Sequence, residues 1–500
     1  MIKPQNLLFI LSDEHNKNIM GCAGHPQIKT PNLDKLANNG THFTNAYTPS
    51  PICVPARACL ATGKNVYQTG FWDNASPYDG SIKSWSHSLR EKGHDVTAIG
   101  KLHYRNDKDD SGFTEAIDNL HVPDGVGDVI GLVRENAPER GGAKKFATEI
   151  GPEESSYTIY DKNVLKNSVN WLQNKSKVSS NKPWLLFVSF VMPHFPLKVP
   201  KDFYNLYDKE KIQIPGKNFF NKEKEHIFIK SLKEVFPYEK YFDEDSRKIA
   251  IACYYGMVSL LDHNIGILLN TLKELGLSDN TRIIYTSDHG ELLGNHGMWG
   301  KMCFHEESVA IPFIASGNDI PKGKKENAPI SLVDMYQTFH DSLGANFANL
   351  ATCQMLHATK VGATPGLSRS AIEDEVLKWN QRAAENGGRR WALPPEAAVV
   401  YPIARDLRDG GFTRAWWLGA EILFQRPPDD DPEQPDALDA AFEALHSGFA
   451  AQCGAVRWNE VFAGRRLVVR DNARVALTHE YGTVLSASVL FARWRLPPKV

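Results

Sequence analysis

Residues 6–14 read Asn-Leu-Leu-Phe-Ile-Leu-Ser-Asp-Glu, an apolar run that ends in two acidic side chains. Such a run is typical of a strand buried on both faces, as in a parallel sheet covered by helices. A helix is predicted next, because Thr30 can cap it, Pro31 suits its first turn and Gly40 can end it. Further strands are predicted at 96–99, 184–191, 282–286 and 311–315, and a long helix at 246–275. The alternation predicts an α/β fold with a large, mostly parallel (mixed) central sheet sandwiched by helices.

Length and composition limit the classes of protein to consider. A chain of 500 residues can hold one large domain and a smaller one. A net charge of -2 gives no electrostatic footprint for nucleic acid or an acidic membrane. No apolar run approaches the roughly 20 residues of a membrane span, and the run at 7–11 is too short for a signal peptide. The seven scattered cysteines form no C-x-x-C pair, so we expect a reducing, cytoplasmic location. No motif indicates an oligomeric state.

The composition changes near residue 346. Residues 1–345 contain 32 Lys and 7 Arg, and residues 346–500 contain 3 Lys and 15 Arg. We therefore expect one large domain over 1–345 and a C-terminal α+β region over 346–500 of uncertain fold, interpreted as a fused or grafted segment. Within that region we predict a loop at 426–435, a helix at 436–449 and strands at 465–469 and 484–491. The lysine-rich residues 207–241 are predicted to form a surface excursion that shapes substrate access.

Cys53 opens the most informative motif, Cys53-Val-Pro-Ala-Arg57, which is followed by Thr62-Gly63. Pro55 suits the first turn of a helix, so Cys53 is expected at a helix N-terminus, where free N–H groups favour an anion. Arg57 lies four residues on, on the same helix face, and could neutralise an oxyanion. A lone cysteine beside an arginine is more often a structural pair.

The spacing of this motif resembles the sulfatase signature Cys-x-Pro-x-Arg-x-x-x-x-Thr-Gly at every defining position, within the alkaline-phosphatase-like superfamily. The resemblance covers about residues 1–345. It implies that a formylglycine-generating or sulfatase-maturing enzyme converts Cys53 to formylglycine. The hydrated aldehyde would then attack sulfur and form a sulfate hemiacetal, and its second hydroxyl would drive the release of sulfate.

Three further segments carry candidate catalytic residues. Lys101 and His103 resemble the second sulfatase signature, and at a strand end they would point the same way. His194 follows the predicted strand 184–191, and Lys301 lies in a glycine-rich loop. The resemblance implies that His194 or Lys301 protonates the leaving alcohol, Lys301 contacts sulfate and His103 acts as the base. Without it, each residue would be interpreted as solvated, capping or structural.

Acidic residues end two of the predicted strands. Asp13 and Glu14 follow the first, and Asp288 and His289 follow another, so these side chains could converge on a divalent cation or cap helices. The resemblance implies that all four are metal ligands together with the modified Cys53. Calcium is usual in the family, but many sulfatases pair two aspartates first and Asp-Asn second. His289 therefore makes Mn²⁺ or Zn²⁺ an alternative.

The resemblance implies hydrolysis of a small-molecule or carbohydrate sulfate monoester to an alcohol and inorganic sulfate. Residues 12–15 and the Asp288-His289 pair look closer to choline-sulfatase-like and phosphonate monoester hydrolase-like members than to lysosomal arylsulfatases. Hydrolysis of a phosphonate monoester or phosphodiester is therefore an alternative. A second alternative is a catalytically inactive binding protein of the same fold, in which Cys53 is never matured.

Overall fold

The computed structural model describes residues 4–128, 132–134, 138–178, 182–215, 225–345, 412–417, 420–425, 466–469 and 492–495. Its centre is an eight-stranded sheet. The strand order is β13 (Lys324–Glu326), β2 (Gly40–Phe43), β12 (Phe313–Ser316), β10 (Thr281–Ser287), β1 (Asn6–Ser12), β8 (Leu185–Ser189), β4 (Val96–Lys101) and β5 (Glu115–Leu120).

The sheet is mixed, as predicted. β10, β1, β8, β4 and β5 pair in parallel. β12 pairs antiparallel with both β10 and β2, and β13 pairs in parallel with β2, so β12 alone runs against the others. The predicted strand at 311–315 is divided at Pro312 into β11 (Ala310–Ile311) and β12. Proline lacks the N–H that a continuous ladder would use.

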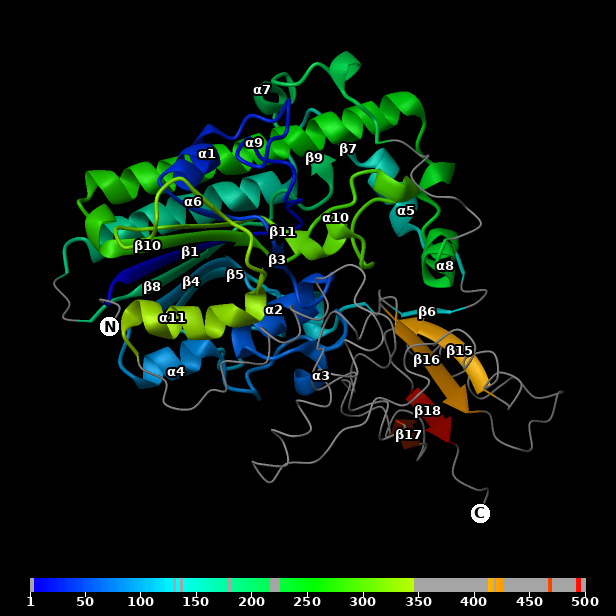
Figure 1. The fold of residues 1–500 in the computed structure, drawn as a ribbon, viewed down its shortest axis with the longest axis horizontal. Coiled ribbons are helices and arrows are strands. Elements are labelled where there is room, and N and C mark those ends of the chain that lie inside the picture. Colours follow the sequence, from blue (N-terminus) through cyan, green and yellow to red (C-terminus); the bar gives the residue numbers. More distant parts are fainter. Residues whose placement is uncertain are drawn as a thin grey trace.

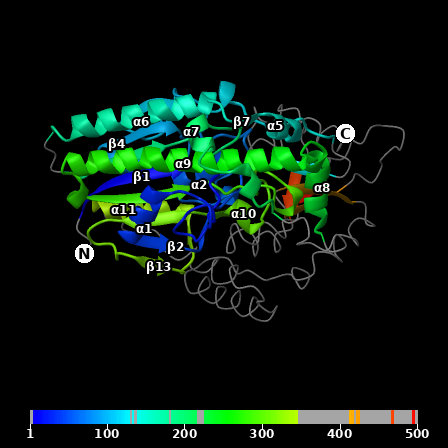
Figure 2. The same ribbon diagram turned by 90° about the horizontal axis from the view of Figure 1, so that it is seen from above.

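Helices cover both faces of this sheet, which confirms the predicted architecture (Figures 1 and 2). One face carries α1 (Pro31–Asn38), α6 (Ser156–Lys175) and α9 (Glu244–Glu274), and the other carries α2 (Cys53–Thr62), α4 (Trp85–Glu91) and α11 (Met335–Leu343). Side chains of β1 alternate between the two faces. Leu8 and Ile10 join the first core, and Leu7, Phe9 and Leu11 join the second.

Shorter elements surround the sheet. The helices are α3 (Val66–Thr69), α5 (Gly142–Thr148), α7 (Lys201–Tyr204), α8 (Ile227–Val235) and α10 (Glu306–Val309). The strands are β3 (Ala46–Tyr47), β7 (Ile150–Gly151), β9 (Leu197–Lys198) and β14 (Ile330–Ser331). Of these strands, β3 and β14 form a three-stranded sheet with β11, and β7 pairs with β9.

The surface excursion predicted at 207–241 is wrong for residues 227–238. Helix α8 buries Phe228, Leu232 and Val235 in the first core, and Tyr238 is buried there too. The many lysines of this segment indicated a solvent-exposed loop. The apolar residues between them instead form one face of an amphipathic helix. Residues 216–224 lie outside the described residues.

Beyond residue 345 only backbone strands are described. β17 (Arg466–Val469) confirms the strand predicted at 465–469 and pairs antiparallel with β18 (Ala492–Arg495). β15 (Phe412–Trp417) pairs antiparallel with β16 (Ala420–Gln425) and with β6 (Leu132–Arg134). The loop, helix and strand predicted at 426–435, 436–449 and 484–491 lie outside the described residues, and the boundary at 346 stays a prediction. Within the described residues, no helix is long and apolar enough to span a bilayer.

Candidate active site

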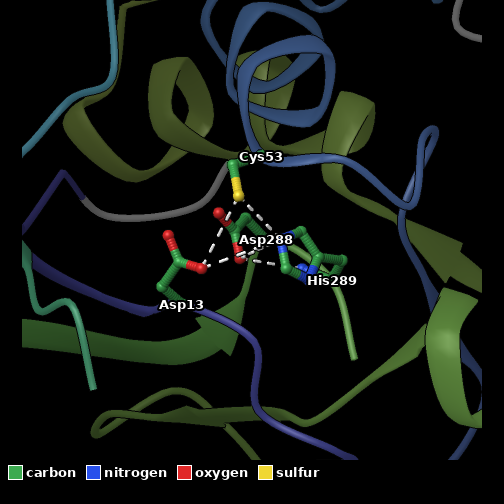
Figure 3. A group of neighbouring side chains, drawn as sticks. All are labelled: Asp13, Cys53, Asp288 and His289. Carbon is green, nitrogen blue, oxygen red and sulfur yellow. Dashed lines mark hydrogen bonds and ion pairs between the residues drawn. The ribbon is translucent and has the colours of Figure 1, made fainter. Parts of the chain in front are cut away.

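The site forms where the parallel strands end. Ser12 of β1 pairs with Ser287 of β10, so the next residues, Asp13 and Asp288, leave neighbouring strands at the same level. Helix α2 approaches this edge with its N-terminus and presents Cys53 to both carboxylates (Figure 3). Carboxyl ends of parallel strands are where such folds bind ligands.

Four side chains converge here: Asp13, Cys53, Asp288 and His289. His289 Nε2 lies 3.1 Å from Cys53 Sγ, 3.7 Å from Asp13 Oδ1 and 3.6 Å from Asp288 Oδ1. Cys53 Sγ lies 3.8 Å from Asp13 Oδ1. All four residues are buried, with at most 1% of their surface exposed.

Arg57 orients both carboxylates. Its Nη2 donates to Asp13 Oδ2 at 3.0 Å and its Nε donates to Asp288 Oδ2 at 2.8 Å, while Nη1 donates to Lys101 O and Ser189 Oγ. The outer oxygen of each carboxylate is thus taken by Arg57, and the inner oxygen faces His289. These four hydrogen bonds fix the guanidinium beside both carboxylates, and the role of Arg57 in neutralising a substrate oxyanion stays a prediction.

The donor set fits a divalent metal ion. His289 Nδ1 lies 3.0 Å from Gly290 O, so the ring donates there and keeps the Nε2 lone pair for a cation. Ligands around one ion are separated by about 3.0 to 3.5 Å when metal–ligand distances are about 2.1 to 2.4 Å. The distances of 3.1 to 3.8 Å from Cys53 and His289 need only a small contraction to match.

Cys53 is the first residue of α2, as predicted from Pro55. Burial is the main factor that raises the pKa of its thiol to about 12, and Asp13 adds to the effect. The unmodified side chain is therefore a neutral thiol, which is a weak nucleophile. The free N–H expected at the helix start is partly used, because Val54 N donates to Asn74 Oδ1 at 3.2 Å. No sequence signal identified Asn74.

Glu14 lies outside the group of four. Its Oε2 is 3.0 Å from Lys301 Nζ and 3.3 Å from His194 Nε2, on the other side of Asp13. Its backbone is left-handed, with a φ of 67°. With Asp13 and His194, Glu14 forms a second group of side chains whose ligand atoms lie close enough to hold a metal ion. Burial raises the pKa of Glu14 to about 8, with Lys301 opposing and Glu291 reinforcing the shift. The structure thus places Glu14 with the candidate proton donors.

The two candidate proton donors differ in charge. Burial lowers the pKa of His194 well below its usual value, and Lys301 lowers it further. Although burial alone would lower the pKa of Lys301, the nearby Cys53, Glu14 and Asp13 raise it well above its usual value. Lys301 therefore carries a proton at neutral pH, whereas His194 is neutral.

Lys101 and His103 flank the opposite side of the site. Lys101 Nζ lies 2.5 Å from Asp13 Oδ2. His103 adopts a φ of 59°, so the simple alternation expected of a strand end does not hold there. Burial, Lys101 and Arg57 lower the pKa of His103 well below its usual value, so the ring is neutral and can accept a proton.

Three buried residues behind the site were not singled out from the sequence. Tyr254 of α9 donates to Glu14 O at 2.7 Å and accepts from Asn16 N at 2.9 Å. Asn16 Nδ2 donates to Glu291 O at 2.7 Å. Their side chains lie on a helix or next to motif residues, and only the tertiary structure shows their hydrogen bonds.

His296 and His305, to which the sequence assigns no role, stack with ring centroids 3.9 Å apart.

The mixed sheet, with acidic and imidazole side chains gathered at its carboxyl edge, has the architecture that the resemblance to sulfatases predicted. A model of the family described as Sulfatase matches residues 5–345. The chain belongs to the sulfatase family, whose members are sulfuric ester hydrolases.

Two curated relatives illustrate the similarity. A choline-sulfatase of Rhizobium meliloti (strain 1021) is 28% identical over 346 residues, which cover 68% of this chain and 67% of that protein. An arylsulfatase of Clostridium perfringens (strain 13 / Type A) is 30% identical over 357 residues, which cover 65% of this chain and 71% of that protein.

The fold is also similar to that of a solved phosphonate monoester hydrolase of Agrobacterium radiobacter. That structure has a TM-score of 0.56 and 21% identity, and the alignment covers 93% of this chain and 98% of that one. At this identity the similarity establishes the fold alone.

Proposed function

We propose that this chain hydrolyses a small-molecule or carbohydrate sulfate monoester with a formylglycine derived from Cys53 and one divalent metal ion. The observation that carries the proposal is the position of Cys53. It opens helix α2 in the sulfatase motif and directs Sγ at His289 Nε2, 3.1 Å away, beside Asp13. A neutral, buried thiol is a weak nucleophile there, whereas an aldehyde hydrate at the same position offers two oxygens.

Asp13, Asp288 and His289 would hold the metal together with the converted Cys53. When bound, the ion supplies Lewis-acid stabilisation of the charge on the ester oxygens. Arg57 and Lys101 hold the carboxylates in place through Asp13 Oδ2 and Asp288 Oδ2. One nitrogen among hard oxygen ligands suits Mn²⁺ or Zn²⁺ as well as the Ca²⁺ usual in the family.

Lys301 carries the proton that the departing alcohol needs, and His194 can relay it because both contact Glu14 Oε2. His103, held neutral, takes the proton from the second hydroxyl of the hydrate so that sulfate leaves. Of the two alternatives, His194 and Lys301, the pKa directions favour Lys301 as the donor, because its pKa is raised and that of His194 is lowered.

Mass analysis of the peptide that contains Cys53 tests this proposal, with protein co-expressed with a sulfatase-maturing enzyme. We expect conversion of the thiol to an aldehyde and hydrolysis of an aryl sulfate. Cys53→Ala should abolish hydrolysis, whereas Cys59→Ala, at another fully buried cysteine of the same helix, should remain active. Substantial hydrolysis by folded Cys53→Ala protein would contradict the proposal. An unconverted thiol and no bound metal would favour the inactive binding protein.

Hydrolysis of a phosphonate monoester or phosphodiester is the second candidate. His289 directly after Asp288 favours it, because this pair departs from the Asp-Asn pair of many sulfatases. Rates on an aryl sulfate and on an aryl phosphonate monoester, measured side by side on one matured preparation, decide between the two. We expect the larger kcat/KM for the sulfate.

A further inference from the structure

Lys301 follows a loop that returns to the site after His289. The loop closes through Leu292 N to Gly300 O at 2.8 Å and Gly294 N to Met298 O at 2.9 Å. Directly after Lys301, Met302 N donates to Pro51 O at 3.1 Å, two residues before Cys53. The position of Lys301 relative to Cys53 therefore depends on how firmly this loop is closed.

The side chain of Glu291 closes it. Glu291 is 1% exposed, and its Oε1 accepts two backbone hydrogen bonds, from Leu293 N at 2.7 Å and from Gly300 N at 2.6 Å. One carboxylate oxygen thus joins the outgoing and returning arms of the loop. Gly300 immediately precedes Lys301, so this bond fixes the peptide between Trp299 and Gly300, one residue before the lysine.

The backbone around Lys301 needs such support. Leu293 has a φ of 49° and Met302 a φ of 78°, both left-handed for residues other than glycine. A left-handed backbone is unfavourable for such residues and persists only where surrounding contacts enforce it. The Glu291 bond to Leu293 N is one such contact, and the Met302 bond to Pro51 O is another.

Glu291 places a carboxyl group at a buried position that an apolar side chain could fill. A buried carboxylate is costly unless it is hydrogen-bonded or paired. Its backbone is held from the first strand, since Asn16 Nδ2 donates to Glu291 O. The nearby titratable groups are Glu14 and Lys301, whose Oε2 and Nζ atoms lie 3.0 Å apart. Glu291 thus acts on the segment that carries Lys301 and lies outside the four metal-directed side chains.

We infer that Glu291 is a positioning residue that sets the place of Lys301 for binding the sulfate group, through its bonds to Leu293 N and Gly300 N. The inference rests on the proposed function, because it takes Lys301 as the cation that meets sulfate. It predicts that sulfate binding depends on an acceptor oxygen at the distance of Glu291 Oε1 from the backbone, whether or not that side chain is charged. Glu291→Gln keeps a carbonyl oxygen at that reach, and Glu291→Asp keeps the charge but shortens the reach.

Inorganic sulfate is the probe, and its affinity for the metal-loaded, full-length protein is measured by calorimetry. We expect Lys301→Ala and Glu291→Ala each to weaken sulfate binding about tenfold, the size of effect seen for residues that support a site. In the Lys301→Ala background, Glu291→Ala should add nothing, since it acts through the lysine. Glu291→Gln should retain the affinity of the wild type, and Glu291→Asp should lose it.

The inference is overturned if Glu291→Ala and Lys301→Ala weaken binding independently, or if Glu291→Asp binds sulfate better than Glu291→Gln. It is also overturned if the wild type does not bind sulfate. If Glu291→Ala does not fold, the sulfate affinities of Glu291→Asp and Glu291→Gln test the inference. Failure of the proposed function would look different: sulfate would bind with this dependence on Glu291, but matured wild type would not hydrolyse an aryl sulfate.

Discussion

Replacing Arg57 by lysine separates its orienting role from its charge. Arg57 donates four hydrogen bonds inside the protein, two of them to the carboxylates of Asp13 and Asp288. A lysine keeps one positive charge but reaches one carboxylate at best. The variant loses one charge-assisted bond, about 1.5 to 3 kcal/mol, and leaves other buried acceptors without a donor. We expect a loss of about 3 to 5 kcal/mol in the free energy of unfolding of the metal-free protein.

Metal affinity should fall as well, by about 10- to 100-fold, because the outer oxygens no longer hold the inner oxygens toward His289. Urea unfolding in chelator measures the first effect, and calorimetric metal titration measures the second. Arg282→Lys is the matched control: Arg282 is buried on β10 and pairs with Asp319 through Nε at 3.0 Å, away from the site. It should lose stability without losing metal affinity. Tight metal binding by Arg57→Lys, or equal weakening by Arg282→Lys, would refute the orienting role.

Three further changes probe the site and its support. Burial raises the pKa of Asp161 to about 7. Because this folded pKa lies above the unfolded value, the stability of the wild type should fall as the pH rises from about 4 to 7. The loss relative to Asp161→Asn should reach about 1.4 kcal/mol per pH unit. Urea-unfolding free energies that change in parallel with pH in both proteins would contradict this. Tyr254→Phe leaves Asn16 N–H without its acceptor and should cost about 1 to 3 kcal/mol in the free energy of unfolding, measured with urea; an unchanged free energy of unfolding would contradict this. His289→Asn replaces the nitrogen ligand by oxygen and should shift bound metal toward Ca²⁺, measured by elemental analysis after dialysis against mixed ions; unchanged metal content would count against His289 as a ligand.

Strands and helix starts with strong local signals were predictable. The first strand is Asn6–Ser12 as expected from its uninterrupted apolar run, and Cys53 opens α2 as expected from Pro55. The long helix begins at Glu244 and not at 246, because Asp243 accepts the N–H of Ser246 and caps it. Each of these features depends on neighbours a few residues apart, which the sequence displays directly.

The tertiary partners of individual side chains were less predictable. The ion pairs of Arg57 with Asp13 and Asp288 were not predicted from the sequence. The contact of Glu14 with Lys301 was not predicted either. Glu291 had no motif at all. Such outcomes depend on which buried charges meet after folding, and residue spacing does not encode that.

The pairing of β1 between β8 and β10 also has a consequence for folding kinetics. Asp13, Cys53, Lys101 and Asp288 come from distant parts of the chain, and β1 reaches its β10 partner 275 positions later, as in Asn6 with Thr281. Closing such long loops is slow, and proteins dominated by non-local pairings fold slowly. A chain that has not yet added β10 lacks Asp288 and His289 at this edge. High-affinity metal uptake should therefore begin only after β10 has paired with β1, and its time course would report that pairing.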